Sequence, residues 1–446
     1  MTPPALESDA SRCRHAAAAR ERSGKVFERN GFFLMSEVNI APIIKGLLND
    51  NGSKILLIVM DGVGGMRTLE HPTTELEAAK TPNLDRIAAE GSLGRVTPAA
   101  RGLAVGSGPG HLSLFGFNPL VPGNDIGRGV LEAAGIDYPL KKTDVAIRGN
   151  FATLDVNGVI TDRRAGRIGG DEAKPVLDKM QAAVKDPIDG VQVKVLPVKE
   201  YRFCLVLEGE GLAAGIADTD PQKTGKAPLP VTPENDSPAT AKTAKVLEKA
   251  IAAMSAAIKD EPKANGFTLR GIAQDPGLPS FQNRYGLKSC AIATYPLYRG
   301  VARLCGMDVL KTGTTVADEF ATLKEVWNDY DFFFLHVKKT DSNGEDGNRD
   351  GKIKVIEETD AALAVVLNEL KPDVIAITGD HSTPPPMKSH SFHPVPLVIT
   401  SKLCDVDDGK RYTERECDKG TFGVFPSYEI MQLIMAHAGR LMKYGS

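Results

Sequence analysis

The chain has 446 residues, of which 42% are hydrophobic and 25% are charged, which is enough apolar sequence for a sizeable core in two or three domains. Its 54 Lys and Arg residues nearly balance 57 Asp and Glu residues, and the formal net charge of -3 argues against nucleic acid as a partner. The longest apolar runs are far shorter than the roughly 20 residues that cross a bilayer, so the sequence predicts no membrane segment.

Residues 1–34 are polar and rich in Arg and Ala. They lack the apolar stretch of a secretory signal, and acidic residues such as Glu7 and Asp9 argue against an organellar transit peptide. The 6 cysteines are scattered without a CxxC pair, which fits reduced thiols. We therefore predict a disordered extension on a cytoplasmic protein, with Met35 as an alternative start of the chain.

Three short, wholly apolar runs predict the buried strands of a mostly parallel sheet with helices on both faces. They cover residues 55–60, 332–335 and 374–377, and each is followed shortly by an aspartate, namely Asp61, Asp341 and Asp380. Ligands bind outside the carboxyl ends of strands in open α/β sheets, so we expect the three acids to converge on one site. Helical patterns at 81–91 and at about 352–370 support the α/β fold.

The middle of the chain, residues 121–283, has a different pattern. It combines strand-like segments at 192–196 and 201–207 with a proline-rich loop at 218–233. We predict a smaller α+β domain inserted here, so that residues 50–120 and 284–446 form one metal-binding core domain. This insertion would explain why the three aspartates fall at both ends of the chain.

A first group of candidate metal ligands follows the last two runs. Asp380 and His381 are adjacent, and they would offer one oxygen and one nitrogen ligand to a divalent ion. Asp341 and Glu345 are four residues apart, so one turn of helix could direct both carboxylates at one ion, with His390 or His393 completing the set. A solvated acidic turn is the alternative explanation for Asp341 and Glu345.

Ser107, in the segment 106–111 (GSGPGH), is the candidate nucleophile. The flanking glycines let the backbone approach a phosphate closely, and a helix that begins near His111 would direct amide donors at an anion. A plain Gly/Pro turn is the alternative.

A basic segment offers a site for substrate anions. Asp162 is followed by Arg163, Arg164 and Arg167, with Arg148 upstream and with Arg128, Arg284 and Lys288 elsewhere. Arginine forks bind phosphate and carboxylate through paired hydrogen bonds, so such a cluster would suit a small phosphoester that also carries a carboxylate. Solvated surface charge is the alternative.

Several ordered segments carry a likeness to a known family. They are residues 59–63 (VMDGV), 80–85 (KTPNLD), 106–119 (GSGPGHLSLFGFNP), 150–168 (NFATLDVNGVITDRRAGRI), 335–341 (LHVKKTD) and 378–383 (TGDHST), with His390 and 394–396 (PVP) after them. From about Lys54 to near its C-terminus the chain resembles the archaeal-type cofactor-independent phosphoglycerate mutases, which have an alkaline-phosphatase-like core with an inserted domain.

The resemblance implies the roles of individual residues. Asp61, Ser107, Asp380 and His381 would bind one divalent ion, with Ser107 also the nucleophile, and Asp341, Glu345 and His390 would bind a second. The related enzymes usually carry His at the position of Glu345, and a carboxylate there should favour Mn²⁺ or Mg²⁺ over Zn²⁺. Asp162, Arg163 and Lys288 resemble substrate-binding residues of the larger bacterial mutases, and Arg148, Arg164, Arg167 and Arg284 complete the substrate-binding set that we predict.

The implied reaction interconverts 3-phosphoglycerate and 2-phosphoglycerate through a phosphoserine, without bisphosphoglycerate, in glycolysis and gluconeogenesis. One alternative is a phosphatase or phosphodiesterase on the same metal core. Another is an inactive binding protein that results from the change at Glu345. A kinase has less support, because the sequence has no Gly-rich nucleotide loop with a Lys-Ser/Thr ending. The oligomeric state stays open.

Overall fold

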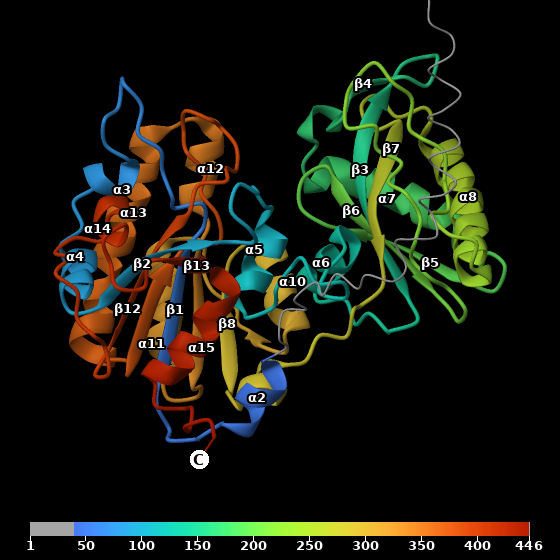
Figure 1. Ribbon diagram of the computed structural model, residues 1–446. Helices are drawn as coiled ribbons and strands as arrows, with labels where there is room; N and C mark the ends of the chain where they lie inside the picture. Colours follow the sequence, from blue (N-terminus) through green and yellow to red (C-terminus); the bar gives the residue numbers. More distant parts are fainter. Residues whose placement is uncertain (1–39, 446) are drawn as a thin grey trace, which may run out of the picture. The chain divides into compact units, whose positions relative to one another are not determined.

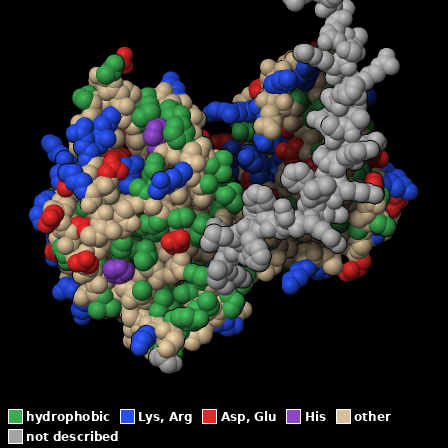
Figure 2. All heavy atoms as spheres, viewed as in Figure 1, with side chains coloured by type: hydrophobic (Ala, Val, Ile, Leu, Met, Phe, Trp, Pro, Cys, Tyr) green, Lys and Arg blue, Asp and Glu red, His purple; other side chains and the backbone are tan. Residues whose placement is uncertain are grey.

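Two sheets organise the chain in the computed structural model, which describes residues 40–445. The predictions made for residues 1–34 and for Met35 lie outside the described residues. Figure 1 shows the path of the chain, and Figure 2 shows Lys and Arg side chains scattered among Asp and Glu side chains over the viewed face. Within residues 40–445, no helix combines the length and the apolar character that a membrane span requires.

The larger sheet has eight strands, and its central strands are parallel. The strands are β1 (Ile55–Met60), β2 (Ser92–Thr97), β8 (Ser289–Ile292), β9 (Asp308–Val309), β10 (Phe332–Val337), β11 (Val374–Thr378), β12 (Val395–Ser401) and β13 (Val424–Pro426). Their order is β13-β2-β12-β11-β1-β10-β8-β9, and β12 runs antiparallel to both of its neighbours. The three predicted strands are therefore present, and they lie next to one another as β11, β1 and β10.

Helices cover both faces of this sheet, as predicted. Successive strand residues point to opposite faces, and in β10 the ring of Phe333 stacks on Trp327 while Phe334 packs against Phe115 on the other side. The helices outside the smaller sheet's region are α2 (Ala41–Gly46), α3 (Glu75–Ala78), α4 (Pro82–Ala89), α5 (Ser107–Leu114), α9 (Phe281–Tyr285), α10 (Pro296–Leu304), α11 (Val316–Glu325), α12 (Lys339–Asp346), α13 (Arg349–Val365), α14 (Glu414–Cys417) and α15 (Ile430–His437), and α6 (Arg128–Gly135) packs between α10 and the smaller sheet. The mixed α/β fold with a mainly parallel sheet is confirmed.

Two helix boundaries differ from the sequence prediction. The helix expected to begin near His111 begins at Ser107, because Gly106 takes the extended N-cap conformation and Pro109 fits the first turn. The helix expected from about Lys352 begins at Arg349, where the side chain of Asn348 accepts a hydrogen bond from the backbone of Gly351. It continues into a π-helical turn at Val366–Leu370.

The smaller sheet is antiparallel and comes from the middle of the chain. Its strands are β3 (Val145–Leu154), β4 (Ile160–Asp162), β5 (Gln192–Pro197), β6 (Arg202–Glu208) and β7 (Gly266–Ala273), with helices α7 (Gly170–Ala183) and α8 (Pro238–Ile258). Apolar side chains of these helices, such as Met180 and Leu247, are buried with Phe151 and Leu205 of the sheet in a hydrophobic core of their own. The alternating strand-like segments therefore correspond to β5 and β6.

Helix α6 packs at backbone distance against elements on two sides. A Cβ atom on Gly129 would lie 2.1 Å from the carbonyl oxygen of Ala146 in β3. A Cβ atom on Gly135 would lie 2.4 Å from the carbonyl oxygen of Pro296 in α10. Glycine is therefore required at both positions, because any side chain would push the helix away from one neighbour or the other.

We expect Gly129→Ala to lower the free energy of unfolding by roughly 1–3 kcal/mol, since the added methyl group would collide with backbone atoms. Thermal unfolding followed by circular dichroism measures this effect. Gly170→Ala, in the first turn of α7, is the matched control, because nothing lies within 4 Å of its added Cβ atom. Equal unfolding temperatures for the two variants would contradict the close packing of α6.

Candidate active site

The candidate site lies at one edge of the eight-stranded sheet. β1 pairs with β10 on one side and with β11 on the other, so that Met60 is opposite Val337 and Val59 is opposite Thr378. All three strands are parallel, and their carboxyl ends therefore meet at the same edge. Asp61 follows β1, Asp380 and His381 follow β11, and α12 after β10 carries Asp341.

The four residues predicted for the first metal ion lie together. Ligand atoms of Asp61, Asp380 and His381 are all within 4.8 Å of one another, and all three side chains are buried. His381 Nε2 lies 3.4 Å from Asp61 Oδ1 and 3.2 Å from Asp380 Oδ2. The hydroxyl of Ser107, the first residue of α5, lies 3.1 Å from the same nitrogen.

The residues predicted for the second ion form an adjoining group. Ligand atoms of Asp341, His381 and His390 lie within 4.8 Å of one another. His390 Nδ1 donates to the carbonyl oxygen of Val105 at 2.8 Å, and this bond turns Nε2 toward Asp341 Oδ1, 3.6 Å away. Glu345 Oε1 also lies 3.6 Å from His390 Nε2, but its side chain is 54% exposed. His393 instead contacts Ser391 Oγ at 3.0 Å.

Both groups fit divalent cations. Asp61 Oδ1 and Asp380 Oδ2 are buried without a hydrogen-bond partner in the described part of the chain. A buried carboxylate oxygen without a donor is costly, and a bound cation would remove that cost. Carboxylate oxygens and imidazole nitrogens together suit Mn²⁺, Mg²⁺ or Zn²⁺.

Lys338 is a site residue that the sequence prediction missed. Its Nζ atom lies 3.1 Å from Asp61 Oδ2 and also contacts Asp341 Oδ2, so it joins the two groups. Burial alone would lower the pKa of Lys338, but the carboxylates of Asp61 and Asp341 raise it above its ordinary value. Burial alone would likewise raise the pKa of Asp61, but Lys338 and His336 hold it well below its usual range.

Two buried histidines behind the acids were also missed. His336 has the same strand parity as Phe334 and points to the same face of β10, where its Nε2 lies 3.3 Å from Asp61 Oδ2. His111, one turn after Ser107, places Nδ1 2.8 Å from the Ser107 carbonyl oxygen and 3.2 Å from Asp380 Oδ2. These contacts orient both acids. The motif segments contain both histidines, but residue type alone does not separate a site histidine from a core histidine.

The start of α5 is packed directly onto the loop after β11. A Cβ atom on Gly110 would lie 2.6 Å from the carbonyl oxygen of Asp380. The glycine therefore allows the helix to approach closely enough for the Ser107 hydroxyl to reach His381. The hydroxyl of Tyr298, from α10, lies 3.5 Å from Ser107 Oγ, and the Tyr298 ring stacks on His336.

Arginines from the five-stranded sheet and α6 form a separate basic cluster. Arg148 of β3 is paired in register with Arg270 of β7, and Arg202 begins β6. Arg148 Nε lies 3.4 Å from Glu132 Oε1, and Arg270 Nε lies 3.2 Å from Asp218 Oδ2. Burial and the charge of Arg270 lower the pKa of Arg128, the first residue of α6. The sequence prediction named Arg148 and mentioned Arg128, but it missed Arg202 and Arg270.

The segment around Asp162, which the sequence predicts to bind substrate, is held by hydrogen bonds between the Asp162 side chain and the backbone that follows it. Asp162 accepts hydrogen bonds from the backbone nitrogen atoms of Arg164 at 2.8 Å and of Gly166 at 2.6 Å. Arg163 Nη2 lies 2.8 Å from Asp220 Oδ2. Arg164 and Arg167 are exposed. The carboxylate of Asp162 therefore fixes the turn that presents the three arginines.

Lys288 and Arg284 of the predicted substrate set have contacts away from the metal-ligand groups. Lys288 precedes β8, and its carbonyl oxygen accepts a hydrogen bond from Phe332 at the start of β10. It therefore lies at the opposite edge of the sheet from Lys338, roughly 20 Å away at about 3.3 Å per residue, and this position argues against the predicted role. Arg284 donates to the carbonyl oxygen of Gly116 and lies over the Phe117 ring, so it supports the loop after α5.

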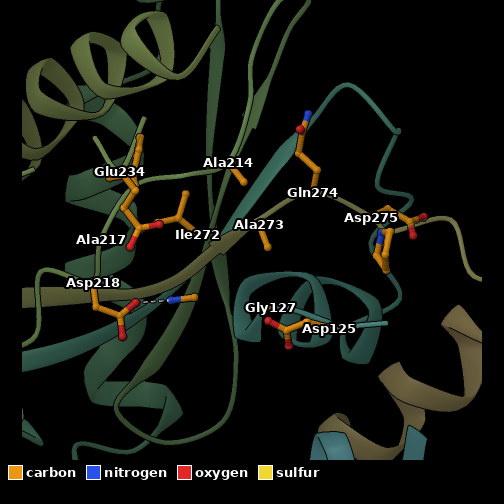
Figure 3. A pocket seen from close by; sticks show the side chains of 13 residues that line it. Asp125, Gly127, Ala214, Ala217, Asp218, Glu234, Ile272, Ala273, Gln274 and Asp275 are labelled. Carbon is orange, nitrogen blue, oxygen red and sulfur yellow. Dashed lines mark hydrogen bonds between the residues drawn. The ribbon is translucent and has the colours of Figure 1, made fainter. Parts of the chain in front are cut away.

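A cavity of about 540 Å³ lies beside the start of α6 (Figure 3). Asp125, Asp218, Glu234 and Asp275 are among its lining residues, and Asp218 accepts a hydrogen bond from the backbone nitrogen of Gly271. Four carboxyl groups around one cavity would repel a phosphoester. We therefore do not assign the substrate to this cavity.

Comparison with known proteins gives consistent matches. A family model described as 2,3-bisphosphoglycerate-independent phosphoglycerate mutase matches residues 88–264. A protein of Aquifex aeolicus (strain VF5), named "Probable 2,3-bisphosphoglycerate-independent phosphoglycerate mutase", is 51% identical over 412 residues, which cover 91% of this chain and 100% of the relative.

Two solved structures share the fold over most of the chain. The PH0037 protein from Pyrococcus horikoshii has a TM-score of 0.76 and 30% identity, and the match covers 88% of this chain and 99% of that one. The cofactor-independent phosphoglycerate mutase from Thermoplasma acidophilum DSM 1728 has a TM-score of 0.65 and 28% identity, with 87% and 100% covered. The resemblance inferred from the motifs is thus confirmed, and the chain belongs to the family of 2,3-bisphosphoglycerate-independent phosphoglycerate mutases.

Proposed function

We propose that this enzyme interconverts 3-phosphoglycerate and 2-phosphoglycerate through a phosphoserine at Ser107. The observation that carries the proposal is the position of the Ser107 hydroxyl, 3.1 Å from His381 Nε2 and beside two groups of acids and imidazoles, of which all members but His390 are buried. Its place at the start of α5 supports phosphate binding, because helix N-termini attract anions. The reaction serves glycolysis and gluconeogenesis.

Two divalent ions fit the donor atoms. Asp61, Asp380, His381 and Ser107 would hold one ion, and Asp341, His390 and Glu345 would hold the other. When bound, the ions would lower the pKa of the Ser107 hydroxyl and stabilise negative charge on the phosphoryl oxygens. The carboxylate of Glu345 favours Mn²⁺ or Mg²⁺ over Zn²⁺ in the second position.

The phosphoryl group is transferred in two steps. In the first, Ser107 Oγ loses its proton and bonds to phosphorus, the bond from phosphorus to the glycerate oxygen breaks, and that oxygen takes up a proton. Glycerate then turns in the site, and its other hydroxyl attacks the phosphoserine and regenerates Ser107. The phosphoryl group stays on the enzyme between the steps, so bisphosphoglycerate is not required.

The basic cluster would hold the glycerate carboxylate while the phosphoryl group is on Ser107. Arg128, Arg148, Arg202 and Arg270 offer several guanidinium forks, and Arg202 Nε is buried without a hydrogen-bond partner among residues 40–445. An unpartnered buried donor of this kind suits an incoming carboxylate. Arg163, Arg164 and Arg167 would add positive charge, with Asp162 as the residue that positions their turn.

Ser107→Ala should lower mutase activity by a factor of about 1,000 or more, because it removes the nucleophile. A coupled enolase assay on 3-phosphoglycerate, with and without bisphosphoglycerate, measures this loss. Ser113→Ala on the same helix is the control, since the Ser113 hydroxyl is hydrogen-bonded to Ser427 and not to a residue of the candidate site. Substantial mutase activity in the Ser107 variant would end the phosphoserine scheme, and phosphate release in place of 2-phosphoglycerate would indicate a hydrolase.

Chelation should abolish activity, and Mn²⁺ should restore it. Glu345→Ala should weaken the binding of the second ion about tenfold, because it removes a carboxylate next to His390. Glu345→His should shift the preference toward Zn²⁺. Metal titration with activity as the readout tests these expectations, with Asp346→Ala as the neighbouring control. An unchanged titration for Glu345→Ala would show that Glu345 is not a ligand.

Arg202→Met should raise KM for 3-phosphoglycerate about 10-fold or more, since it removes a charged hydrogen-bond donor to the substrate. Arg86→Met is the control, because the Arg86 side chain on α4 is 52% exposed and forms its ion pair with Glu90 of the same helix turn. Steady-state kinetics on both variants measure the two KM values. A KM for the Arg202 variant equal to that of the control would remove this arginine from the substrate site.

A further inference from the structure

Lys352 is a lysine with no exposed surface, although charged side chains of this kind are rarely buried fully. It lies near the start of α13, and its Nζ atom donates to three backbone carbonyl oxygens. These belong to Gly62 at 2.8 Å, Gly64 at 3.1 Å and Thr383 at 3.0 Å. An ammonium group has three donors and no acceptor, so the three carbonyls use its full hydrogen-bonding capacity.

The three carbonyls come from the two loops that carry the proposed metal ligands. Gly62 and Gly64 follow Asp61 at the end of β1, and Thr383 follows His381 at the end of β11. The loops also meet in a short bridge between Val63 and Ser382. Lys352 therefore joins two segments that are more than three hundred residues apart in sequence, directly behind the ligands.

The residues that Lys352 holds in turn hold ligand side chains. The backbone nitrogen of Gly62 donates to Asp380 Oδ1 at 3.1 Å. Thr383 Oγ1 lies 2.7 Å from Asp341 Oδ1 and 3.0 Å from His381 Nδ1. Through these two residues the ammonium group is coupled to ligands of both proposed ions.

The surroundings of Lys352 leave little freedom for the loops to move independently. A Cβ atom on Gly62 would lie 2.4 Å from Thr383 Oγ1, and one on Gly344 would lie 2.3 Å from the Thr383 carbonyl oxygen. Glu75, which is also buried, lies 3.8 Å from the ammonium group. Glu414 accepts from the backbone of Gly65 at 3.0 Å and borders the same region.

A small cage of carbonyl oxygens with acids behind it is the environment that proteins offer to a bound cation. Burial lowers the pKa of Lys352 to about 8, and the acids Glu75 and Glu414 oppose this shift. The carboxylates of Glu75 and Glu414 therefore favour the charged form of the Lys352 side chain.

We propose that the ammonium group of Lys352 acts as a built-in structural cation, which fills a carbonyl cage and thereby positions the ligands of both metal ions. Lys352 is a positioning residue and does not touch the substrate. The inference rests on the ligand roles proposed above, but not on the phosphoserine.

The test compares Lys352→Ala, which leaves the cage empty, with Lys352→Met, which fills its volume without a charge. Mn²⁺ affinity of the full-length chain is measured by titration, with and without ammonium or methylammonium ions. We expect both variants to bind Mn²⁺ about 10- to 100-fold more weakly than the wild type. Ammonium or methylammonium should restore much of the affinity of the alanine variant and none of that of the methionine variant.

Lys354→Ala is the matched control, because Lys354 lies on the same helix with its side chain 77% exposed. Unchanged Mn²⁺ affinity in the Lys352 variants would overturn the proposal, and so would weakened affinity that no amine restores. If the alanine variant is unfolded without ammonium, the same comparison is made on its thermal transition, where a lack of ammonium dependence would also overturn it. A wild-type chain that binds no Mn²⁺ would instead refute the proposed metal sites.

Discussion

The structure depends on the electrostatic balance between several buried carboxylates and the positive groups around them. Asp61, Asp341 and Asp380 meet at one sheet edge, and burial together with the charge of Asp61 raises the pKa of Asp341. Like charges so close together need positive partners. Lys338 lies between Asp61 and Asp341, imidazoles lie against Asp61 and Asp380, and the proposed metal ions would supply the rest.

Much of the large sheet was predictable from sequence because its central strands are buried on both faces. Such strands are continuous apolar runs, and β1, β10 and β11 have that form. β2 and β12 lacked this signal. β2 contains Gly94 and Arg95, and β12 contains Pro396, residues that are typical of turns or edges, and only their pairing in the tertiary structure stabilises them as strands.

Some residues of the candidate site could be predicted because their position after a strand identifies them. Residues that are distinguished only by their burial were harder to predict. Asp61, Asp380 and His381 follow the ends of strands closely, and Asp341 lies on the helix after β10, so strand prediction grouped them at one edge. His336 and Lys352 were missed because their burial is a property of the fold, and Lys338 was missed because its contacts with two acids are. Arg202 and Arg270 lie on different strands, and their grouping requires the register of β3 with β6 and β7. Lys288 precedes its strand, while the metal-ligand groups lie where strands end, and the motif alone did not indicate this separation.

The contacts of Thr383 have a consequence for the protons of the site. His381 turns Nε2 toward Asp61 and Asp380, so Nδ1 carries the hydrogen whenever Nε2 offers its lone pair. That hydrogen is donated to Thr383 Oγ1, whose own hydrogen is then donated to Asp341 Oδ1. The relay runs in one direction only, from imidazole through hydroxyl to carboxylate. It favours the tautomer of His381 that carries its hydrogen on Nδ1, and it ends on Asp341 Oδ1 as the acceptor, so one threonine links residues proposed as ligands of two different cations.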